Sequence, residues 1–171
     1  MRIYTTITGP LGELLVTGER TAAARGGVAL VSVAFSGQAR AFGVRPEWRR
    51  DDDAFTEVRR QFREYFAGER TGFGLGLAAA GGTAFQQRVW TALEAIPYGE
   101  TTAYGTLTGR VGEPRDRVRA VAAAVGANPL LIVRPCHRVV GADGALTGYA
   151  GGIERKRHLL DHEAAQQTLP V

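Results

Sequence analysis

The residues most able to do chemistry lie in one short run, Arg134 to Val140, in which Cys136 directly precedes His137. Cys136 is the only cysteine among 171 residues, and His137 is one of 3 histidines. A thiol becomes a strong nucleophile when it loses its proton, which requires a base or neighbouring positive charge. Arg134, His137 and Arg138 offer both close to the sulfur. The pattern is therefore that of a candidate nucleophilic cysteine.

The alternative is a buried structural cysteine, because a free thiol behaves as a small apolar side chain. A Cys-His pair taken alone favours this alternative. The run 129–133 before the cysteine is apolar and β-branched and predicts a buried strand, whereas residues 141–144 are turn-forming. Cys136 is therefore expected in a tight segment at the end of a strand. His137 would then point in a different direction, so that a water must link the two side chains.

Composition excludes several classes of protein. With 44% apolar and 22% charged residues, the chain has the composition of a globular protein long enough for one large or two small domains. It has no apolar run of about 18 residues, and the N-terminus reads directly into a strand pattern, so we expect a cytoplasmic protein without a membrane span. One cysteine excludes an intramolecular disulfide and a multi-cysteine zinc site. The net charge of +4 permits a polyanionic partner but does not identify one.

The first half of the chain predicts a small α/β domain, residues 1–82. Strand-like runs at 3–8 and 13–17 flank a Gly-Pro-Leu-Gly turn and predict a hairpin, and 28–35 predicts a third strand. Apolar residues at helical spacing predict a helix over 54–67 that packs on the sheet. The run Asp51-Asp52-Asp53 is better explained as a solvated loop before this helix than as a metal site.

The second half, residues 83–171, predicts a mainly α domain. It begins after the glycine-rich segment 78–82, where Thr83 and Gln86 have the spacing of a capping box. The helix that follows ends before Pro97, and Trp90 is expected in its core. Helices over 101–109 and 114–126 have helix-turn-helix spacing, with Pro114 at the first helical position. The last helix, 153–165, is expected to expose most of its charged side chains, Lys156 among them.

The second helix of the helix-turn-helix pair has two different faces. At about 100° per residue, Val118, Val121 and Val125 fall together, and the opposite face carries Arg119, Ala123, Gly126 and Ala127. Small side chains would let this helix approach a narrow groove of DNA. They could equally pack against another helix, and geometry alone does not decide between the two.

A series of short motifs between residues 83 and 163 resembles the O6-alkylguanine-DNA alkyltransferases. Pro135 to Val139 matches the active-site signature of that family. The other matching segments stand in family order, at 85–90, 96–101, 104–105, 119–121, 128–129, 148–152 and 159–163.

The resemblance implies a fold and a function. It implies a ribonuclease-H-like N-terminal domain, a C-terminal domain with a helix-turn-helix and a short active-site strand, and direct reversal of DNA damage by a methylated-DNA-protein-cysteine methyltransferase. Each molecule would transfer one alkyl group from O6-alkylguanine to Cys136, with O4-alkylthymine a further candidate substrate. The partner would be double-stranded DNA, bound through its minor groove. No cofactor and no metal are implied, and the protein would be a monomer, with clustering on DNA as a further possibility.

The resemblance also assigns roles to residues in the reaction. The thiol of Cys136 would pass its proton through water to His137, which Glu163 would orient. Tyr149 would bind the purine N3, and the backbone N–H of Ala150 would face O6. The carbonyls of Cys136 and Val139 would accept the exocyclic amine.

On the DNA side, the resemblance implies a flipped nucleotide. Tyr104 would rotate the target phosphate, and Arg119 would fill the gap in the base stack. Ala123 and Gly126 would lie on the helix surface that enters the groove. Asn128 would tie this helix to the active-site strand.

Three other functions remain open. A non-catalytic protein that recognises alkylated DNA ranks second, although the well-known members of that group replace the cysteine. A helix-turn-helix transcription regulator would leave Cys136 and Glu163 without a role. A cysteine hydrolase ranks last, because no oxyanion-hole motif is visible.

Overall fold

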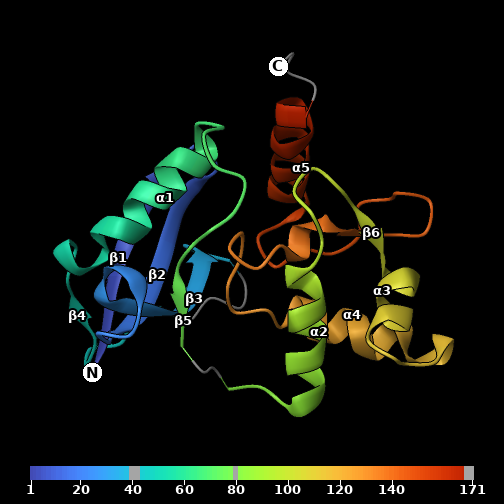
Figure 1. The fold of residues 1–171 in the computed structure, drawn as a ribbon, viewed down its shortest axis with the longest axis horizontal. Coiled ribbons are helices and arrows are strands. Elements are labelled where there is room, and N and C mark those ends of the chain that lie inside the picture. Colours follow the sequence, from blue (N-terminus) through green and yellow to red (C-terminus); the bar gives the residue numbers. More distant parts are fainter. Residues whose placement is uncertain (39–42, 79–80, 168–171) are drawn as a thin grey trace. The chain divides into compact units, whose positions relative to one another are not determined.

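The computed structural model describes the chain apart from residues 39–42, 79–80 and 168–171 (Figure 1). The chain divides into two compact units, residues 1–80 and 81–171. The sequence places the boundary at 82/83, at the end of the glycine-rich segment 78–82, of which residues 79–80 lie outside the described part.

The N-terminal unit is built on a five-stranded sheet in the order β4-β1-β2-β3-β5. Its antiparallel centre consists of β1 (Arg2–Gly9), β2 (Gly12–Arg20) and β3 (Val28–Phe35). Two short strands, β4 (Arg49–Arg50) and β5 (Gly76–Leu77), pair in parallel at the edges. The predicted hairpin and third strand are confirmed. The short strands were not predicted, because two residues carry no periodicity.

The helix expected over 54–67 is present and begins with a 3-10 turn, Asp53–Phe55, followed by α1 (Thr56–Phe66). Figure 1 shows α1 lying along the sheet. Phe55, Val58 and Phe62 are buried, so the apolar stripe forms the core of this unit.

The acidic run before α1 is a loop held by arginines. Asp51 pairs with Arg20 and Arg49, and Asp52 pairs with Arg50. Over the described residues, no three His, Cys, Asp or Glu side chains are grouped as a metal site requires.

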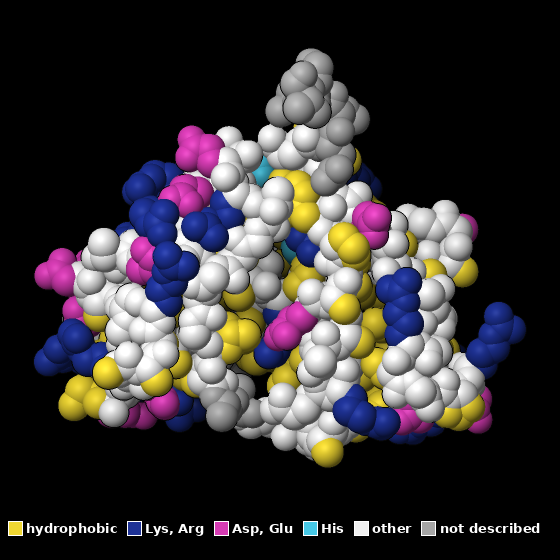
Figure 2. All heavy atoms as spheres, in the orientation of Figure 1, with side chains coloured by type: hydrophobic (Ala, Val, Ile, Leu, Met, Phe, Trp, Pro, Cys, Tyr) yellow, Lys and Arg dark blue, Asp and Glu magenta, His cyan; other side chains and the backbone are white. Residues whose placement is uncertain are grey.

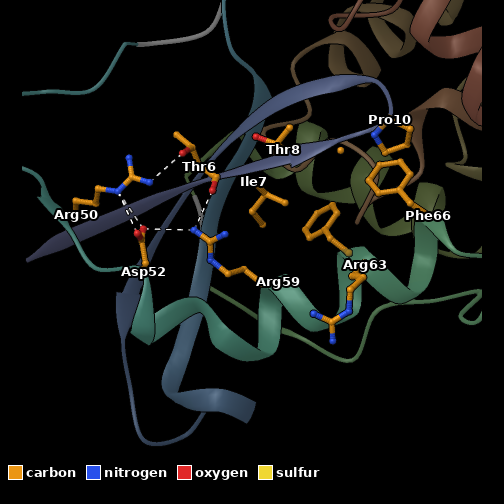
Figure 3. A pocket seen from close by; sticks show the side chains of 11 residues that line it. Thr6, Ile7, Thr8, Pro10, Arg50, Asp52, Arg59, Arg63 and Phe66 are labelled. Carbon is orange, nitrogen blue, oxygen red and sulfur yellow. Dashed lines mark hydrogen bonds and ion pairs between the residues drawn. The ribbon is translucent and has the colours of Figure 1, made fainter.

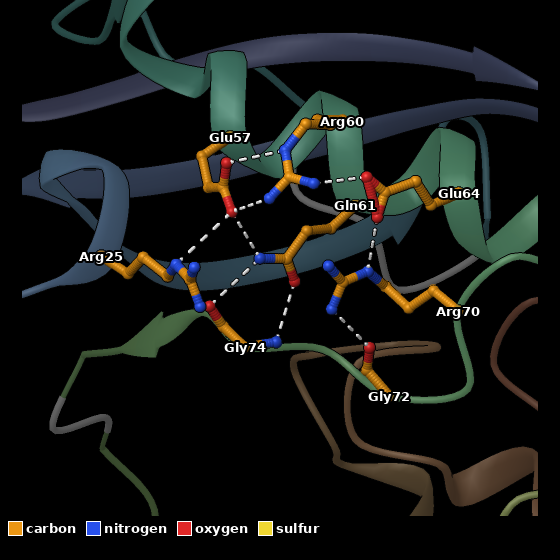
Figure 4. A network of polar contacts seen from close by, with 8 residues as sticks. All are labelled: Arg25, Glu57, Arg60, Gln61, Glu64, Arg70, Gly72 and Gly74. Carbon is orange, nitrogen blue, oxygen red and sulfur yellow. Dashed lines mark hydrogen bonds and ion pairs between the residues drawn. The ribbon is translucent and has the colours of Figure 1, made fainter.

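A polar network fixes the segment that leads out of the N-terminal unit (Figure 4). Gln61 is buried, accepts the N–H of Gly74 at 2.8 Å and donates to the carbonyl of the same residue at 3.2 Å. Arg70 donates to Glu64 and to the carbonyl of Gly72, both at 3.0 Å. On the face seen in Figure 2, basic and acidic side chains are interspersed over this unit. The segment is thus anchored to α1 by a buried amide and surface ion pairs.

The C-terminal unit begins with α2 (Ala84–Glu94). The predicted capping box is confirmed: the Thr83 side chain accepts the N–H of Gln86 at 3.1 Å, and the Gln86 side chain accepts the N–H of Thr83 at 2.9 Å. Trp90 is buried, as predicted, and its indole N–H donates to the carbonyl of Ala124 at 2.8 Å.

The next two helices begin later than expected. They are α3 (Tyr104–Arg110) and α4 (Val118–Gly126), and a 3-10 turn, Arg115–Arg117, leads into α4. Pro114 is therefore not the first helical residue. It precedes the 3-10 turn in extended backbone, with ψ at 159°.

A two-stranded parallel sheet and a long helix complete the unit. The strands are β6 (Thr102–Ala103) and β7 (Val139–Val140), and the helix is α5 (Ile153–Gln167). In the part of the chain that is described, no helix is long and apolar enough to cross a membrane.

Candidate active site

Cys136 lies in a tight turn, which corrects the prediction that it ends a strand. The predicted strand 129–133 is instead a series of turns, closed by local backbone hydrogen bonds within residues 130–134. Ile132 has a φ of 71°, a left-handed conformation that a regular strand excludes. A 3-10 turn, Cys136–Arg138, follows directly. The segment is apolar because it is buried, and burial without periodicity cannot distinguish a strand from a turn.

Asn128 holds this turn in place. It follows the C-terminus of α4, is buried, and donates to the carbonyl of Arg134 at 2.9 Å while accepting the N–H of Leu130 at 3.0 Å. The carbonyl of Arg134 also accepts the N–H of Cys136 at 2.8 Å. Asn128 thus connects α4 to the segment of the cysteine, the tie that the family resemblance implied, but through a turn in place of the expected strand.

The Cys136 thiol is protonated at neutral pH. It is only 5% exposed, and burial raises its pKa to about 11, although the Asn128 amide and the charge of Lys156 act in the opposite direction. The sulfur therefore needs a base before it can act as a nucleophile.

His137 and Glu163 form the predicted pair, and Arg138 completes it. Nε2 of His137 lies 2.9 Å from Oε2 of Glu163, and both side chains are buried. Arg138 donates to the same carboxylate through Nε at 2.7 Å and through Nη2 at 3.0 Å. Although burial alone raises the pKa of Glu163, the hydrogen bonds from His137 and Arg138 lower it to about 2. Glu163 is therefore a carboxylate at any physiological pH.

This arrangement fixes the tautomer of His137. Burial lowers its pKa more than Glu163 raises it, so the ring is neutral at pH 7. Because a carboxylate can only accept hydrogen bonds, Nε2 carries the proton and Nδ1 carries the lone pair. Nδ1 is buried, and the described residues give it no hydrogen-bond partner. His137 is thus a neutral base. Glu163, on Nε2, would stabilise the positive charge of the ring if Nδ1 took up a proton.

Lys156 is a functional candidate that the sequence prediction placed wrongly. It is fully buried, and its Nζ donates to the carbonyls of Val139, Thr147 and Gly148 at 2.6, 2.8 and 3.2 Å. Burial lowers its pKa to about 8, while Cys136 opposes that change. The ammonium therefore joins α5 to the chain on both sides of the loop after Cys136. Lys156 is the only lysine of the sequence, and this could have singled it out, but the prediction considered only the pattern of charges along the helix.

The arginines beside the cysteine are directed elsewhere. Arg134 is buried over the ring of Trp90, at 5.2 Å from its centroid, and donates to Glu94 at 3.1 Å. Arg138 binds Glu163 and donates to the carbonyl of Ile96 at 2.7 Å. Their positive charges were predicted to activate the thiol. Arg138 is instead held by its own partners. Nη1 of Arg134 is buried without a hydrogen-bond partner among the described residues, but Arg134 is a lesser influence on the Cys136 pKa than Lys156.

Two tyrosines also interact with the cysteine. Burial and then Cys136 raise the pKa of Tyr149 well above its usual value, and its hydroxyl has no hydrogen-bond partner among the residues described. The pKa of Tyr104 is also raised, first by burial, and its ring lies 5.9 Å from Nζ of Lys156. Ala150, in the loop before α5, is half-buried. The structure thus brings the predicted tyrosines to one site.

The predicted division of α4 into two faces is confirmed. Val121 and Val125 are buried, whereas the other face is exposed and carries Arg119, Ala123, Gly126 and Ala127. Glu113 precedes this helix, and two arginines offset the negative charge of its carboxylate. Arg88 binds it at 2.8 Å, and Arg117 lies 3.6 Å from it.

Family comparisons cover both units. Residues 2–79 match the ribonuclease-like domain of 6-O-methylguanine DNA methyltransferase, and residues 84–165 match its DNA binding domain. These matches agree with the ribonuclease-like and DNA-binding units that the resemblance implied.

Individual relatives match nearly the whole chain. A Methylated-DNA--protein-cysteine methyltransferase of Mycobacterium tuberculosis is 45% identical over 163 residues, covering 95% of this chain and 93% of the relative. A protein of the same name from Methanosarcina acetivorans is 40% identical over 162 residues, covering 95% and 98%.

Solved structures give the same result. The crystal structure of M. tuberculosis O6-methylguanine methyltransferase matches with a TM-score of 0.85 at 42% identity, covering 100% of this chain and 96% of that one. The M. tuberculosis protein OGT in complex with DNA also matches with a TM-score of 0.85, at 44% identity, covering 96% and 94%. With both units matched and the cysteine motif in place, the chain belongs to the 6-O-methylguanine DNA methyltransferase family.

Proposed function

We propose that this protein repairs double-stranded DNA by moving the alkyl group of O6-alkylguanine to the sulfur of Cys136, once per molecule. The observation that carries the proposal is the buried His137–Glu163–Arg138 arrangement next to a buried thiol. A structural cysteine needs no such base. Membership of the family supplies the reaction. The roles proposed below follow the family resemblance, and the contacts of the described residues support them.

The first role is activation of the thiol. A neutral His137 takes the thiol proton through its free Nδ1 by way of a water, and Glu163 stabilises the imidazolium that forms. The charge of Lys156 and the amide of Asn128, which both lower the Cys136 pKa, stabilise the thiolate. The sulfur then attacks the alkyl carbon. A carbon–sulfur bond forms, the bond to O6 breaks, and its electron pair goes to the purine, which takes up one proton in place of the one the thiol lost.

The second role is recognition of the purine. Tyr149 keeps its proton, because its pKa is raised, and it can donate a hydrogen bond to N3 as charge develops on the leaving group. The N–H of Ala150 would face O6. The carbonyl of Val139 accepts Lys156, and that of Cys136 accepts the N–H of Val139. Each keeps a second lone pair for the exocyclic amine.

The third role is access to the base. The alkylated atom is unreachable within a duplex, so the nucleotide must leave the stack at a cost of a few kcal/mol. The exposed small residues Ala123 and Gly126 let α4 approach the minor groove as the second helix of a helix-turn-helix, and Arg119 on the same face replaces the lost stacking. Tyr104, at the start of α3, would turn the target phosphate.

Intact-mass spectrometry tests the proposal. After incubation with a duplex that contains O6-methylguanine, the wild type should gain one methyl group, mapped to Cys136, and should not turn over. Cys136→Ala should gain none and should bind the duplex with little change in affinity. Tight binding by the wild type without an adduct would instead indicate a recognition protein, and repeated turnover would indicate a hydrolase.

A further inference from the structure

Over the residues that the structure describes, the N-terminal sheet has an open edge along β1, beyond the two positions that pair with β4. The short strand β4 covers this edge only opposite Ile3 and Tyr4. The carbonyl of Tyr4 accepts the N–H of Asp51 on this side, so the backbone groups of Tyr4 face the edge. Because strand backbone groups alternate in direction, those of Thr6 and Thr8 face the same edge. The carbonyl of Thr6 accepts Nη2 of Arg59 at 2.9 Å, so the N–H of Thr6 and the backbone groups of Thr8 are the ones left for another strand. Open edges of this kind are templates for another strand.

A groove of about 690 Å³ lies between this edge and α1 (Figure 3). One wall is β1, from Thr6 to Gly9, and the other is the side of α1 that carries Arg59, Arg63 and Phe66. The apolar part of the lining consists of Ile7, Pro10, Phe62 and Phe66. Among the residues that the structure describes, the groove therefore offers the N–H of Thr6 and the backbone of Thr8 without partners, next to apolar surface.

The charge of the groove is positive. Its lining residues include three arginines, Arg50, Arg59 and Arg63, and a single acidic residue, Asp52, a net charge of +2. The Asp52 carboxylate is already bound by Thr5 at 2.7 Å and Arg50 at 3.1 Å, with Arg59 at 3.4 Å. Arg63 is exposed and forms no ion pair with any residue that the structure describes. A carboxylate entering the groove would find cations without a matching anion.

We propose that this groove binds an extended acidic segment of a partner protein, which adds to β1 as a further strand. The segment pairs its backbone with Thr8 and with the N–H of Thr6, as in β-strand addition. Its carboxylates reach Arg59 and Arg63, and an apolar side chain between them contacts Phe66.

Two other occupants fit less well. A second copy of this chain, pairing β1 with β1, would bring two arginine clusters together, and like charges across a strand pair are destabilising. Nucleic acid would satisfy the arginines but would leave the strand edge without a backbone partner.

The test is a titration of the full-length ¹⁵N-labelled protein followed by amide chemical shifts. The probe is a capped heptapeptide of alternating valine and glutamate, and its matched control has lysine in place of glutamate. The glutamate peptide should shift the amides of Thr6, Thr8 and Arg63, and the lysine peptide should not. Absence of shifts at these amides up to millimolar peptide would overturn the proposal, as would equal shifts with both peptides. Shifts of the same amides by an undamaged DNA duplex would assign the groove to nucleic acid instead.

Variants separate the strand edge from the charge. Thr8→Pro removes the N–H that faces the open edge, and edge strands tolerate proline, whereas Thr8→Val keeps that N–H. Proline should weaken binding of the glutamate peptide about five- to tenfold, the usual worth of one hydrogen bond, and valine should not.

Arg63→Glu should also weaken binding, whereas Arg157→Glu on α5, with the same change in net charge, should have no effect. All four variants should alkylate free O6-benzylguanine at the wild-type rate, which shows that they fold. Equal binding by Thr8→Pro and Thr8→Val would exclude strand addition, and equal binding by the two arginine variants would exclude recognition of the acidic side chains.

Discussion

Replacing Glu163 by glutamine removes a buried charge and keeps the shape of the side chain. The carboxylate is 1% exposed and holds hydrogen bonds from His137 and Arg138. In the variant the Arg138 guanidinium stays buried but faces a neutral amide, whose nitrogen can only donate. We therefore expect a large loss of stability in the C-terminal unit.

The size of the loss follows from the pKa. The Glu163 pKa falls from 4.5 to about 2 on folding, and each pH unit corresponds to about 1.4 kcal/mol, which gives about 3 kcal/mol. Breaking a buried ion pair by removing one partner costs a similar amount, about 3–5 kcal/mol. Because the folded pKa is the lower one, this stability is present above pH 4.5 and is lost as the pH falls from about 5 to about 2.

The assay is equilibrium unfolding in urea at pH 7 and at steps down to pH 3. A Trp48→Phe background leaves Trp90, which is buried in the C-terminal unit, as the only tryptophan reporter. The matched control is Glu154→Gln, the same change on the same helix, where the side chain is 79% exposed. Glu163→Gln should be about 3 kcal/mol less stable at pH 7, and the difference should shrink toward pH 3. If both variants unfold at the same urea concentration, or if the difference does not change with pH, the buried carboxylate does not stabilise the fold as argued.

Other predictions concern the reaction and its product. Arg119→Ala should slow repair of duplex DNA, because the flipped state loses about 1–3 kcal/mol of stacking free energy. The rate of reaction with free O6-benzylguanine should not change. Equal losses of rate on both substrates would place Arg119 in the fold or the pocket. Lys156→Met removes a cation that lowers the Cys136 pKa. The pH profile of the rate of alkylation by O6-benzylguanine should therefore shift to higher pH than in the wild type. An unchanged pH profile would exclude this role. Benzylation of Cys136, which is 5% exposed, should overpack the site by about 1–3 kcal/mol and lower the melting temperature more than methylation does; equal melting of benzylated and untreated protein would show that the pocket accommodates the adduct.

The sequence by itself determined the features that local pattern encodes. The capping box at Thr83, the three main strands and the buried and exposed faces of α4 follow from spacing along the chain, because each depends on neighbours a few residues away. The sequence also indicated a candidate nucleophile and base, since Cys136 and His137 are adjacent in the motif. The pairing of His137 with Glu163 came from the family resemblance, as the two are far apart in sequence.

Only the tertiary structure decided which charged groups lie at the candidate active site. Charge patterning could not show that Lys156 turns inward to bind three carbonyls, or that Arg134 is directed to Glu94 and away from the thiol. The turn at 129–133 depends on Asn128 and on a left-handed Ile132, and its composition resembles that of a strand because both are buried. Burial and the partner of a charged group are set by segments distant in the chain, so the protonation states of Cys136 and His137 emerge only when α5 packs against the turn that carries them.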